Sequence, residues 1–160
     1  MNLRIQLIFI IAAFLFFLNC DNSSIYRQNF KVSDEAWNTD ELMVFSPNIN
    51  DTVNGFDIYF TIRHTVDYPF RNIILFVTIS SPDNQEVTDT INVLLADEKG
   101  KWKGSGLGDI YDLPVLYKQN VRFPLQGIYT FEVIHGMRKY PLPGVIDVGM
   151  NIKRFVKKRN

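Results

Sequence analysis

The sequence predicts an all-β protein, an antiparallel two-sheet sandwich of about seven or eight strands that follows an N-terminal signal-peptide helix. Three observations predict this fold. Apolar and polar residues alternate with a period of two in several short segments, and no segment after the leader has the longer period of an amphipathic helix. Gly, Pro, Asn and Asp separate these segments at short intervals. Hydrophobic residues make up 46% of the chain and aromatic residues 14%, enough to fill a core.

The N-terminus has the organisation of an export signal. Arg4 supplies a positive start, and residues 7–18 form an unbroken apolar run. Such a run fits the roughly 7–15 residues of a signal-peptide core and is shorter than the roughly 18 that a membrane-spanning helix requires. It ends at Asn19 and Cys20, the only cysteine of the chain. Residues 17–20 resemble a bacterial lipoprotein cleavage box, although the first and third positions depart from the usual Leu and small residue.

In signals of this kind the cysteine becomes the lipidated first residue of the mature protein, so we expect acylation of Cys20. An unpaired thiol in an exported protein needs an explanation, and acylation provides one. Each buried methylene of an acyl chain contributes about 0.8 kcal/mol, so several chains would hold the protein firmly to a membrane. Two alternatives remain open: an ordinary secretory signal with an incidental cysteine, and an uncleaved N-terminal anchor.

This interpretation divides the chain into four segments. Residues 1–19 are the lipoprotein signal peptide, residues 20–29 a lipidated tether, residues 30–153 the β-sandwich domain and residues 154–160 a basic tail. Arg4 is the only charged residue lost with the signal peptide, which leaves 16 of the 17 basic side chains against 17 acidic ones and a net charge of −1. A charge so close to zero provides no field for nucleic-acid binding.

The first strands are assigned from alternation and from the turns that flank them. Residues 41–45 form a short candidate strand, and an Asn-Gly pair at 54–55 is a turn signal of the hairpin kind. Residues 56–63 then alternate without a break, with four apolar side chains on one face. Residues 73–80 and 86–95 form a hairpin around a polar turn.

The second half of the domain is less regular. Residues 96–112 contain four glycines and little periodicity, so a turn, a short strand around Trp102 and a loop are expected there. Residues 113–118 suit either a short strand or one turn of helix. Residues 128–135 form a strong strand, and residues 146–152 alternate again as the last one.

No pattern in the sequence predicts catalysis, so we expect a protein that is not an enzyme. His64 and His135 are the only histidines, and neither has a serine or cysteine predictably near. We expect His64 on the surface in a loop with Asp67, and His135 at a polar rim. Two histidines are too few for a zinc site, and the acidic residues around Asp109 do not have the spacing of an EF-hand loop. The glycines of 100–108 lack the Lys-Ser/Thr ending of a phosphate-binding loop, so no cofactor and no metal ion is expected.

Aromatic residues provide the best candidate for a binding surface. We assign Trp102, Tyr68 and Tyr111 to it, with Asp109 of the glycine-rich loop, because exposed aromatic rings bind sugars and protein partners. The alternative is that these rings belong to the core, as most aromatic side chains in such a domain do. Tyr129 has the position of a tyrosine that pins a corner between two sheets.

Seven stretches of the chain, taken in order, point to a known family. They are residues 63–72, 95–97 with 100–102, 106–110, 121–125, 127–132, 137–138 and 145–149. Together they resemble the gliding-motility lipoproteins of the H type from Bacteroidetes, and the likeness extends to the signal that ends at Cys20. The resemblance implies a cell-envelope lipoprotein required for surface gliding, a process tied to the type 9 secretion machinery. It brings no catalytic residue and no ligand.

These inferences combine into one functional hypothesis with two rivals. We expect a non-enzymatic interaction or assembly component of the gliding apparatus, anchored through Cys20 to the periplasmic side of the outer membrane. Its expected partners are membrane lipid and proteins of the gliding and secretion apparatus. The first rival is a lipid-anchored carbohydrate-binding module that uses Trp102, Tyr68 and the loop 100–112. The second is a cryptic enzyme or hydrolase accessory built around His64, which requires a carboxylate or hydroxyl within hydrogen-bond reach.

Overall fold

The computed structural model describes residues 23–157, which form strands and the loops between them. The signal peptide and Cys20 lie outside the described residues, so cleavage and lipidation stay predictions. Within residues 23–157 no helix has the length and apolar character needed to cross a bilayer. The one helical element of this part is η1 (Ser33–Glu35), a single 3-10 turn.

The strands in chain order are β1 (Ser24–Lys31), β2 (Ala36–Trp37), β3 (Met43–Phe45), β4 (Asn48–Ile49), β5 (Phe56–Thr65), β6 (Asn72–Ser80), β7 (Glu86–Leu94), β8 (Ser105–Leu107), β9 (Ile110–Val121), β10 (Gly127–Ile128), β11 (Thr130–His135), β12 (Leu142–Pro143) and β13 (Val145–Arg154).

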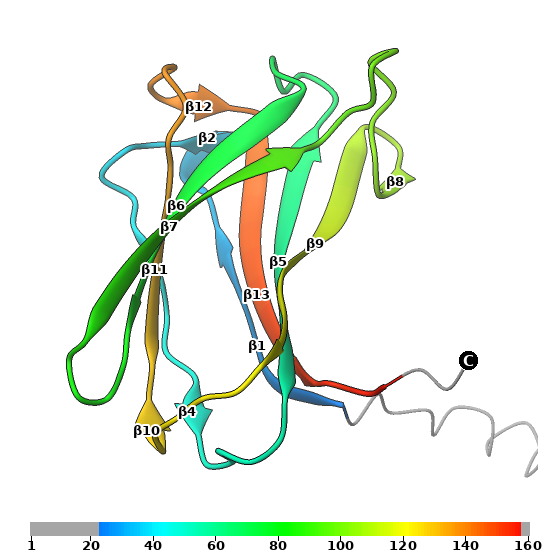
Figure 1. Ribbon diagram of the computed structural model, residues 1–160. Helices are drawn as coiled ribbons and strands as arrows, with labels where there is room; N and C mark the ends of the chain where they lie inside the picture. Colours follow the sequence, from blue (N-terminus) through cyan, green and yellow to red (C-terminus); the bar gives the residue numbers. More distant parts are fainter. Residues whose placement is uncertain (1–22, 158–160) are drawn as a thin grey trace, which may run out of the picture.

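These strands form two main antiparallel sheets that face each other (Figure 1). A five-stranded sheet has the order β1-β13-β5-β9-β8, and a four-stranded sheet has the order β3-β11-β6-β7. Two small strand pairs, β10-β4 and β12-β2, complete the structure. Among the described residues seven strands have six or more residues, and the others have two or three. The predicted all-β, two-sheet sandwich is confirmed.

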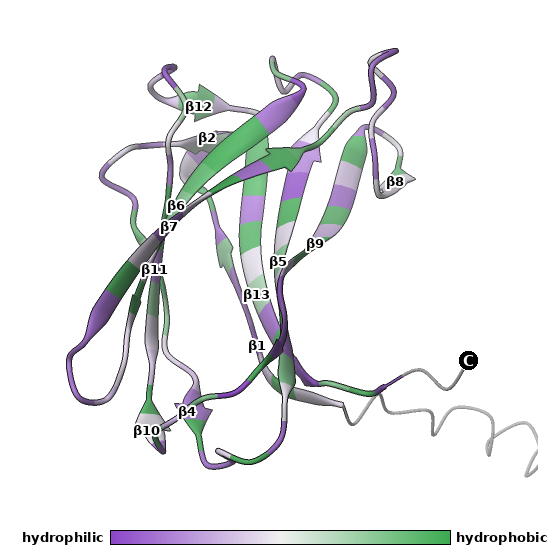
Figure 2. Ribbon diagram, viewed as in Figure 1, coloured by the Kyte–Doolittle hydropathy of each residue, from purple (hydrophilic) through white to green (hydrophobic). Residues whose placement is uncertain are grey.

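The core lies between the two sheets and is built by strict alternation. The four apolar residues of β5 that the sequence placed inward are at most 1% exposed. Figure 2 shows the alternation as bands of contrasting hydropathy along β5 and β13. The ring of Phe60 lies 6.4 Å from the ring of Phe45 in the opposite sheet and 5.1 Å from the ring of Tyr117 in its own, centroid to centroid. Burial of one such ring contributes about 1.5–3 kcal/mol, so alternation alone secures much of the sandwich.

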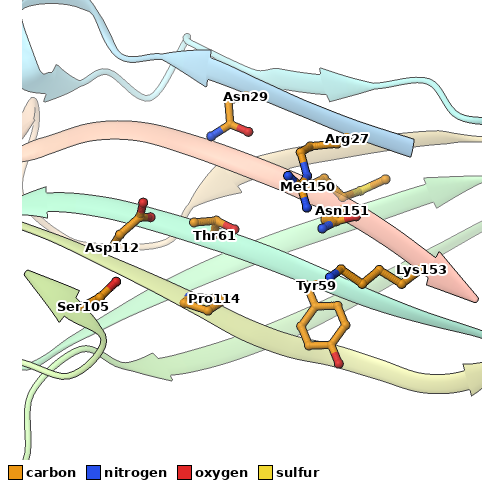
Figure 3. Close-up of a pocket in the computed structure, with 10 residues that line it drawn as sticks. All are labelled: Arg27, Asn29, Tyr59, Thr61, Ser105, Asp112, Pro114, Met150, Asn151 and Lys153. Atoms are coloured by element: carbon orange, nitrogen blue, oxygen red, sulfur yellow. The ribbon is translucent and has the colours of Figure 1, made fainter. Parts of the chain in front are cut away.

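The outer face of the five-stranded sheet is largely polar. Tyr59 and Thr61 of β5 lie on this face, because the residues that alternate with them fill the core. Figure 3 shows both side chains on the same side of the sheet as Asn151 of β13 and Asp112 of β9. The sheet therefore presents an apolar face to the core and a hydrogen-bonding face to solvent.

The expected tether is shorter than the sequence suggested. Residues 24–29, which were assigned to it, belong to β1 and pair antiparallel with β13. Tyr26 and Phe30 lie on the inner side of β1 and pack against the core. The segment looked like a tether because its other positions are mostly polar. It is nevertheless an edge strand, because only alternate residues of such a strand face the core and the others can be polar.

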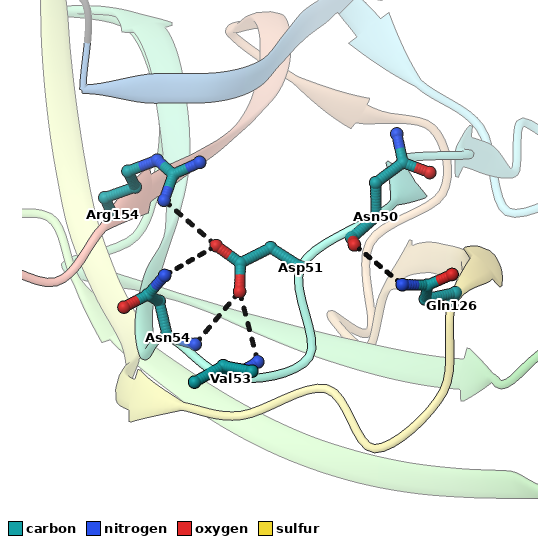
Figure 4. A network of polar contacts seen from close by, with 6 residues as sticks. All are labelled: Asn50, Asp51, Val53, Asn54, Gln126 and Arg154. Atoms are coloured by element: carbon teal, nitrogen blue, oxygen red, sulfur yellow. Dashed lines mark hydrogen bonds and ion pairs between the residues drawn. The ribbon is translucent and has the colours of Figure 1, made fainter.

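The loop before β5 is not a hairpin turn. The Asn-Gly pair at 54–55 was expected to join two paired strands, but β4 pairs with β10 while β5 pairs with β13 and β9. The carboxylate of Asp51 organises this loop by accepting the backbone N–H groups of Val53 at 3.1 Å and Asn54 at 3.0 Å (Figure 4). The backbone hydrogen bond from Asn54 is the main reason why the pKa of Asp51 falls to about 2.

The same carboxylate holds the end of the last strand. Arg154, which was assigned to the basic tail, is the final residue of β13, and its Nη1 lies 2.9 Å from Oδ2 of Asp51. The next residue, Phe155, donates its backbone N–H to the carbonyl of Gly55 at 2.8 Å. The start of the predicted tail is therefore fastened to the loop before β5.

β9 decides between the alternatives for residues 113–118 in favour of a strand. It runs for 12 residues and pairs with β5 along its length. β8 pairs only with the first three residues of β9, so beyond Asp112 that side of β9 is an open edge. An open edge tolerates Pro114, which has no N–H to donate to a ladder.

The predicted corner tyrosine is confirmed. Tyr129 is buried, and its hydroxyl accepts the N–H of Leu125 at 3.1 Å and donates to the carbonyl of Leu125 at 3.2 Å. These bonds fix the segment in which the chain crosses from β9 in one sheet to β11 in the other.

Candidate functional site

The structure brings three of the four predicted surface residues together around a histidine. The period of two turns His64 of β5 inward, and the register of the sheet sets it opposite Tyr111 of β9. The centroid of the His64 ring lies 4.6 Å from that of Trp102, 5.7 Å from Tyr68 and 5.9 Å from Tyr111. We call these four residues the His64 cluster.

The His64 cluster belongs mainly to the edge of the core and only in part to the surface. Tyr68 is only 3% exposed, and its hydroxyl donates to the carbonyl of Asn72 at 2.9 Å. Burial raises the pKa of Tyr68. Trp102 and Tyr111 are half-buried, and Asp109 is exposed on the loop beside them. Trp102 and Tyr68 therefore do not share an exposed concave face.

The expectation that His64 is a surface residue in a loop is wrong. β5 continues through Thr65, two residues past the predicted end of the strand, and His64 is fully buried. Its Nδ1 lies 2.9 Å from the carbonyl oxygen of Thr65, so Nδ1 carries the proton and Nε2 presents a lone pair. Nε2 has no hydrogen-bond partner among the described residues. Burial lowers the pKa of His64, and the hydrogen bond to Thr65 opposes that effect only in part.

The expectation that His135 lies at a polar rim is also wrong. His135 ends β11 on the buried side of the strand. Its Nε2 donates to the carbonyl of Trp37 at 3.1 Å, and the two rings lie 5.2 Å apart, centroid to centroid. Burial is the main cause of its lowered pKa. Both histidines thus lie in apolar surroundings and bond to backbone carbonyls, an arrangement that suits packing better than proton transfer.

Two of the acidic residues near Asp109, namely Asp97 and Asp112, have structural partners. Oδ1 of Asp97 accepts the backbone N–H groups of Lys99 and Lys101, each at 2.9 Å, and so caps its turn. Asp112 pairs with Arg63 across neighbouring strands at 2.9 Å. Within residues 23–157 no three His, Cys, Asp or Glu side chains gather as a metal site would require.

Sequence reasoning missed a charged network on the outer face of the five-stranded sheet. Arg63 of β5 lies between Asp112 of β9 and Asp147 of β13, with Nη1 3.0 Å from Oδ2 of Asp147. Nδ2 of Asn29 in β1 donates to the other oxygen of Asp147 at 3.1 Å. The hydrogen bond to Asp112, followed by the charge of Asp147, raises the pKa of Arg63. Alternation predicts that Arg63 points outward, but no local signal identifies its partners.

Comparison with known proteins adds a family to this geometry. A family model described as "GldH lipoprotein" matches residues 24–152. The "Gliding motility lipoprotein GldH homolog" of Christiangramia forsetii is 29% identical over 147 residues, which cover 88% of this chain and 90% of that protein. The "Gliding motility lipoprotein GldH" of Flavobacterium johnsoniae is 29% identical over 161 residues, which cover 96% of this chain and 99% of that protein.

Similarity to solved structures is weak. A chain from the crystal structure of the T13 IBDV viral particle gives a TM-score of 0.33 and 12% identity, over 81% of this chain and 28% of that chain. A likeness at this level carries no argument about fold or function.

Proposed function

We propose that this chain, which belongs to the GldH lipoprotein family, is a lipid-anchored envelope protein that supports gliding motility as a non-enzymatic interaction component. The observation that carries the proposal is the family match over residues 24–152, joined to two near full-length relatives named as gliding motility lipoproteins. We further propose that it works with the type 9 secretion machinery from the periplasmic face of the outer membrane.

The early start of β1 supports a close connection between anchor and domain. Only four residue steps separate Cys20 from Ser24, and an extended chain of that length spans no more than about 14 Å. Ser24 lies at the end of the sandwich where β13 finishes and where Asp51 binds Arg154 (Figure 1). In the proposed arrangement that end lies against the membrane and the end with β2 and β12 points away. Anchoring of this kind raises the effective concentration of the domain near partners on the same membrane.

The surroundings of His64 support a non-enzymatic role. Its ring bonds to a backbone carbonyl and otherwise lies among aromatic side chains, and no carboxylate or hydroxyl of residues 23–157 hydrogen-bonds to it as a general base would require. The rival carbohydrate module relied on Trp102 and Tyr68 side by side at the surface. The burial of Tyr68 removes the basis for that version.

The proposal is tested in a gliding bacterium whose own copy of the gene has been deleted. The cells receive the wild-type chain, Cys20→Ala, or Asn22→Ala as a matched control that leaves the cysteine in place, and they are fed an alkyne-tagged fatty acid. We expect label, membrane fractionation and gliding with the wild type and the control, and loss of all three with Cys20→Ala. Label that persists on Cys20→Ala contradicts lipidation at this residue. Gliding that persists without the label contradicts the role of the anchor.

The same cells test the proposed partners. Crosslinking before lysis, followed by identification of the captured proteins, should recover components of the gliding and secretion apparatus with the wild-type chain and lose them with Cys20→Ala. Recovery of the same components from the unanchored protein would refute the colocalisation argument, and recovery of none would refute the interaction role.

A further inference from the structure

The outer face of the five-stranded sheet carries a trough whose shape follows from the strand register. One row across the sheet consists of Asn29, Gly149, Thr61 and Pro114, each opposite the next on neighbouring strands. Gly149 has no side chain, and the amide of Asn29 lies over it, so that a Cβ there would come within 2.8 Å of Oδ1 of Asn29. The row therefore carries only short or flat-lying side chains.

Longer side chains border this low row on both sides. On one side Arg27, Asn151 and Tyr59 follow one another across β1, β13 and β5. On the other side the row is Asp147, Arg63, Asp112 and Ser105. Figure 3 shows side chains from both borders, with Arg27, Asn151 and Tyr59 along one side and Asp112 and Ser105 along the other.

The trough has the size of a ligand site. Two adjoining hollows of about 540 and 500 Å³ share Ser105 and Asp112 and together extend over all five strands. Small-molecule sites commonly have about 300–1,000 Å³. Neighbouring strands lie about 4.8 Å apart, so the distance across four strands is about 14 Å, comparable with a short oligosaccharide.

The side chains of the trough offer both hydrogen-bond donors and acceptors. Asn29 uses its amide nitrogen for Asp147, which leaves its carbonyl oxygen as an acceptor, whereas Asn151 accepts from Ser24 at 2.7 Å with its oxygen and keeps its nitrogen as a donor. The half-buried ring of Tyr59 adds a flat apolar surface. Closely spaced donors and acceptors beside one aromatic face match the hydroxyls and the C–H face of a pyranose ring.

A peptide strand fits this surface less well. An added strand lies along a sheet edge, whereas the trough runs across the strands of the sheet. An anion is the main rival, because Arg27, Lys31 and Lys153 line the hollows in addition to Arg63 and its partners Asp112 and Asp147, and the test measures it directly. From the hydrogen-bonding groups and the ring of Tyr59 we propose that the trough binds a neutral oligosaccharide, an activity that the gliding role does not assign and that uses a face other than the His64 cluster.

The test is isothermal titration of the full chain in a polyoxyethylene detergent, which has no sugar headgroup to compete. The probes are chitotetraose, cellotetraose and maltotetraose, with inorganic phosphate as an anionic comparison. We expect at least one tetrasaccharide to bind, with a Kd about tenfold higher for Tyr59→Ala because the stacking surface is lost. Tyr140→Ala is the matched control, since Tyr140 is 60% exposed and does not line the trough.

A second variant protects the test against a folding defect. Arg27 is exposed on the edge strand β1, so Arg27→Ala should fold normally and also weaken binding. Failure of all three tetrasaccharides to bind at millimolar concentration overturns the proposal. It is equally overturned if phosphate alone binds, or if Tyr59→Ala and Arg27→Ala bind as tightly as the wild type. None of these outcomes bears on the lipid anchor, so this proposal fails independently of the proposed function.

Discussion

Removal of Asp147 should destabilise the domain more than removal of Asp112, although both carboxylates hold the same arginine. Arg63 makes one short contact with each of them, at 3.0 Å and 2.9 Å. The two partners differ in burial, because the side chain of Asp147 is 7% exposed and that of Asp112 is 35% exposed. Asp147 also accepts a second hydrogen bond, from Asn29.

The magnitudes follow from this difference. A hydrogen bond to a charged group contributes about 1.5–3 kcal/mol, and a solvent-exposed ion pair contributes about 0–1 kcal/mol. Arg63 is 41% exposed, which screens both pairs and favours the lower values. Asp147→Ala also leaves the amide of Asn29 without its partner. We therefore expect a loss of about 2–3 kcal/mol in the free energy of unfolding for Asp147→Ala and about 0.5–1 kcal/mol for Asp112→Ala.

Urea unfolding followed by tryptophan fluorescence measures both losses, because Trp37 is fully buried in the folded domain. High salt should reduce the effect of Asp112→Ala more than that of Asp147→Ala, since screening acts mainly on exposed charges. A double-mutant cycle with Arg63→Ala separates the two pair energies. If Asp112→Ala proves as destabilising as Asp147→Ala, burial does not rank these interactions and the reasoning is refuted.

Two further predictions concern the corner and the buried histidines. Tyr129→Phe removes the two hydrogen bonds to Leu125 and should lower the free energy of unfolding by about 1–2 kcal/mol in the same urea assay, and an unchanged midpoint would contradict the corner. Burial holds the pKa values of His64 and His135 below their ordinary 6.5. Below about pH 6.5 the unfolded chain therefore takes up protons that the folded chain does not. The free energy of unfolding should decrease as the pH is lowered below about 6.5 and should stay level just above that pH. Urea midpoints at pH 7.5, 6.0 and 5.0 measure this pH dependence. It should be weaker in a His64→Gln, His135→Gln double variant, and an equal pH dependence in that variant would disprove the burial argument.

The strands that the sequence predicted well are those with one buried face and one solvated face along their whole length. β5 and β6 have clear alternation, so their positions could be found without knowledge of their partners. β1 was missed because its sequence is polar enough for a tether, and only pairing with β13 gives its inner residues a core to contact. His64 was missed because the predicted strand ended two residues too early, which moved the histidine from the inner face into a loop.

The candidate sites could not be predicted from spacing, because they depend on strand order. Arg63 binds partners 49 and 84 residues further along the chain, and nothing near it in the sequence indicates either of them. The aromatic residues assigned to a surface do come together, but the direction in which a ring points depends on the end of β5 and on the loop that covers it. The resemblance identified the family and left these arrangements open.

β1 connects the two proposals in physical terms. It is the edge of the five-stranded sheet, it begins four residues after Cys20, and it supplies Arg27 and Asn29 to the trough. Arg27 is seven residues from Cys20, so in extended chain it lies within about 25 Å of the proposed anchor. A trough at that distance, on the side of a domain whose end rests on the membrane, would meet glycans close to the bilayer and oriented along its plane. In the proposed arrangement, the short connection that would confine the domain to the membrane would therefore also restrict which saccharides the trough could reach.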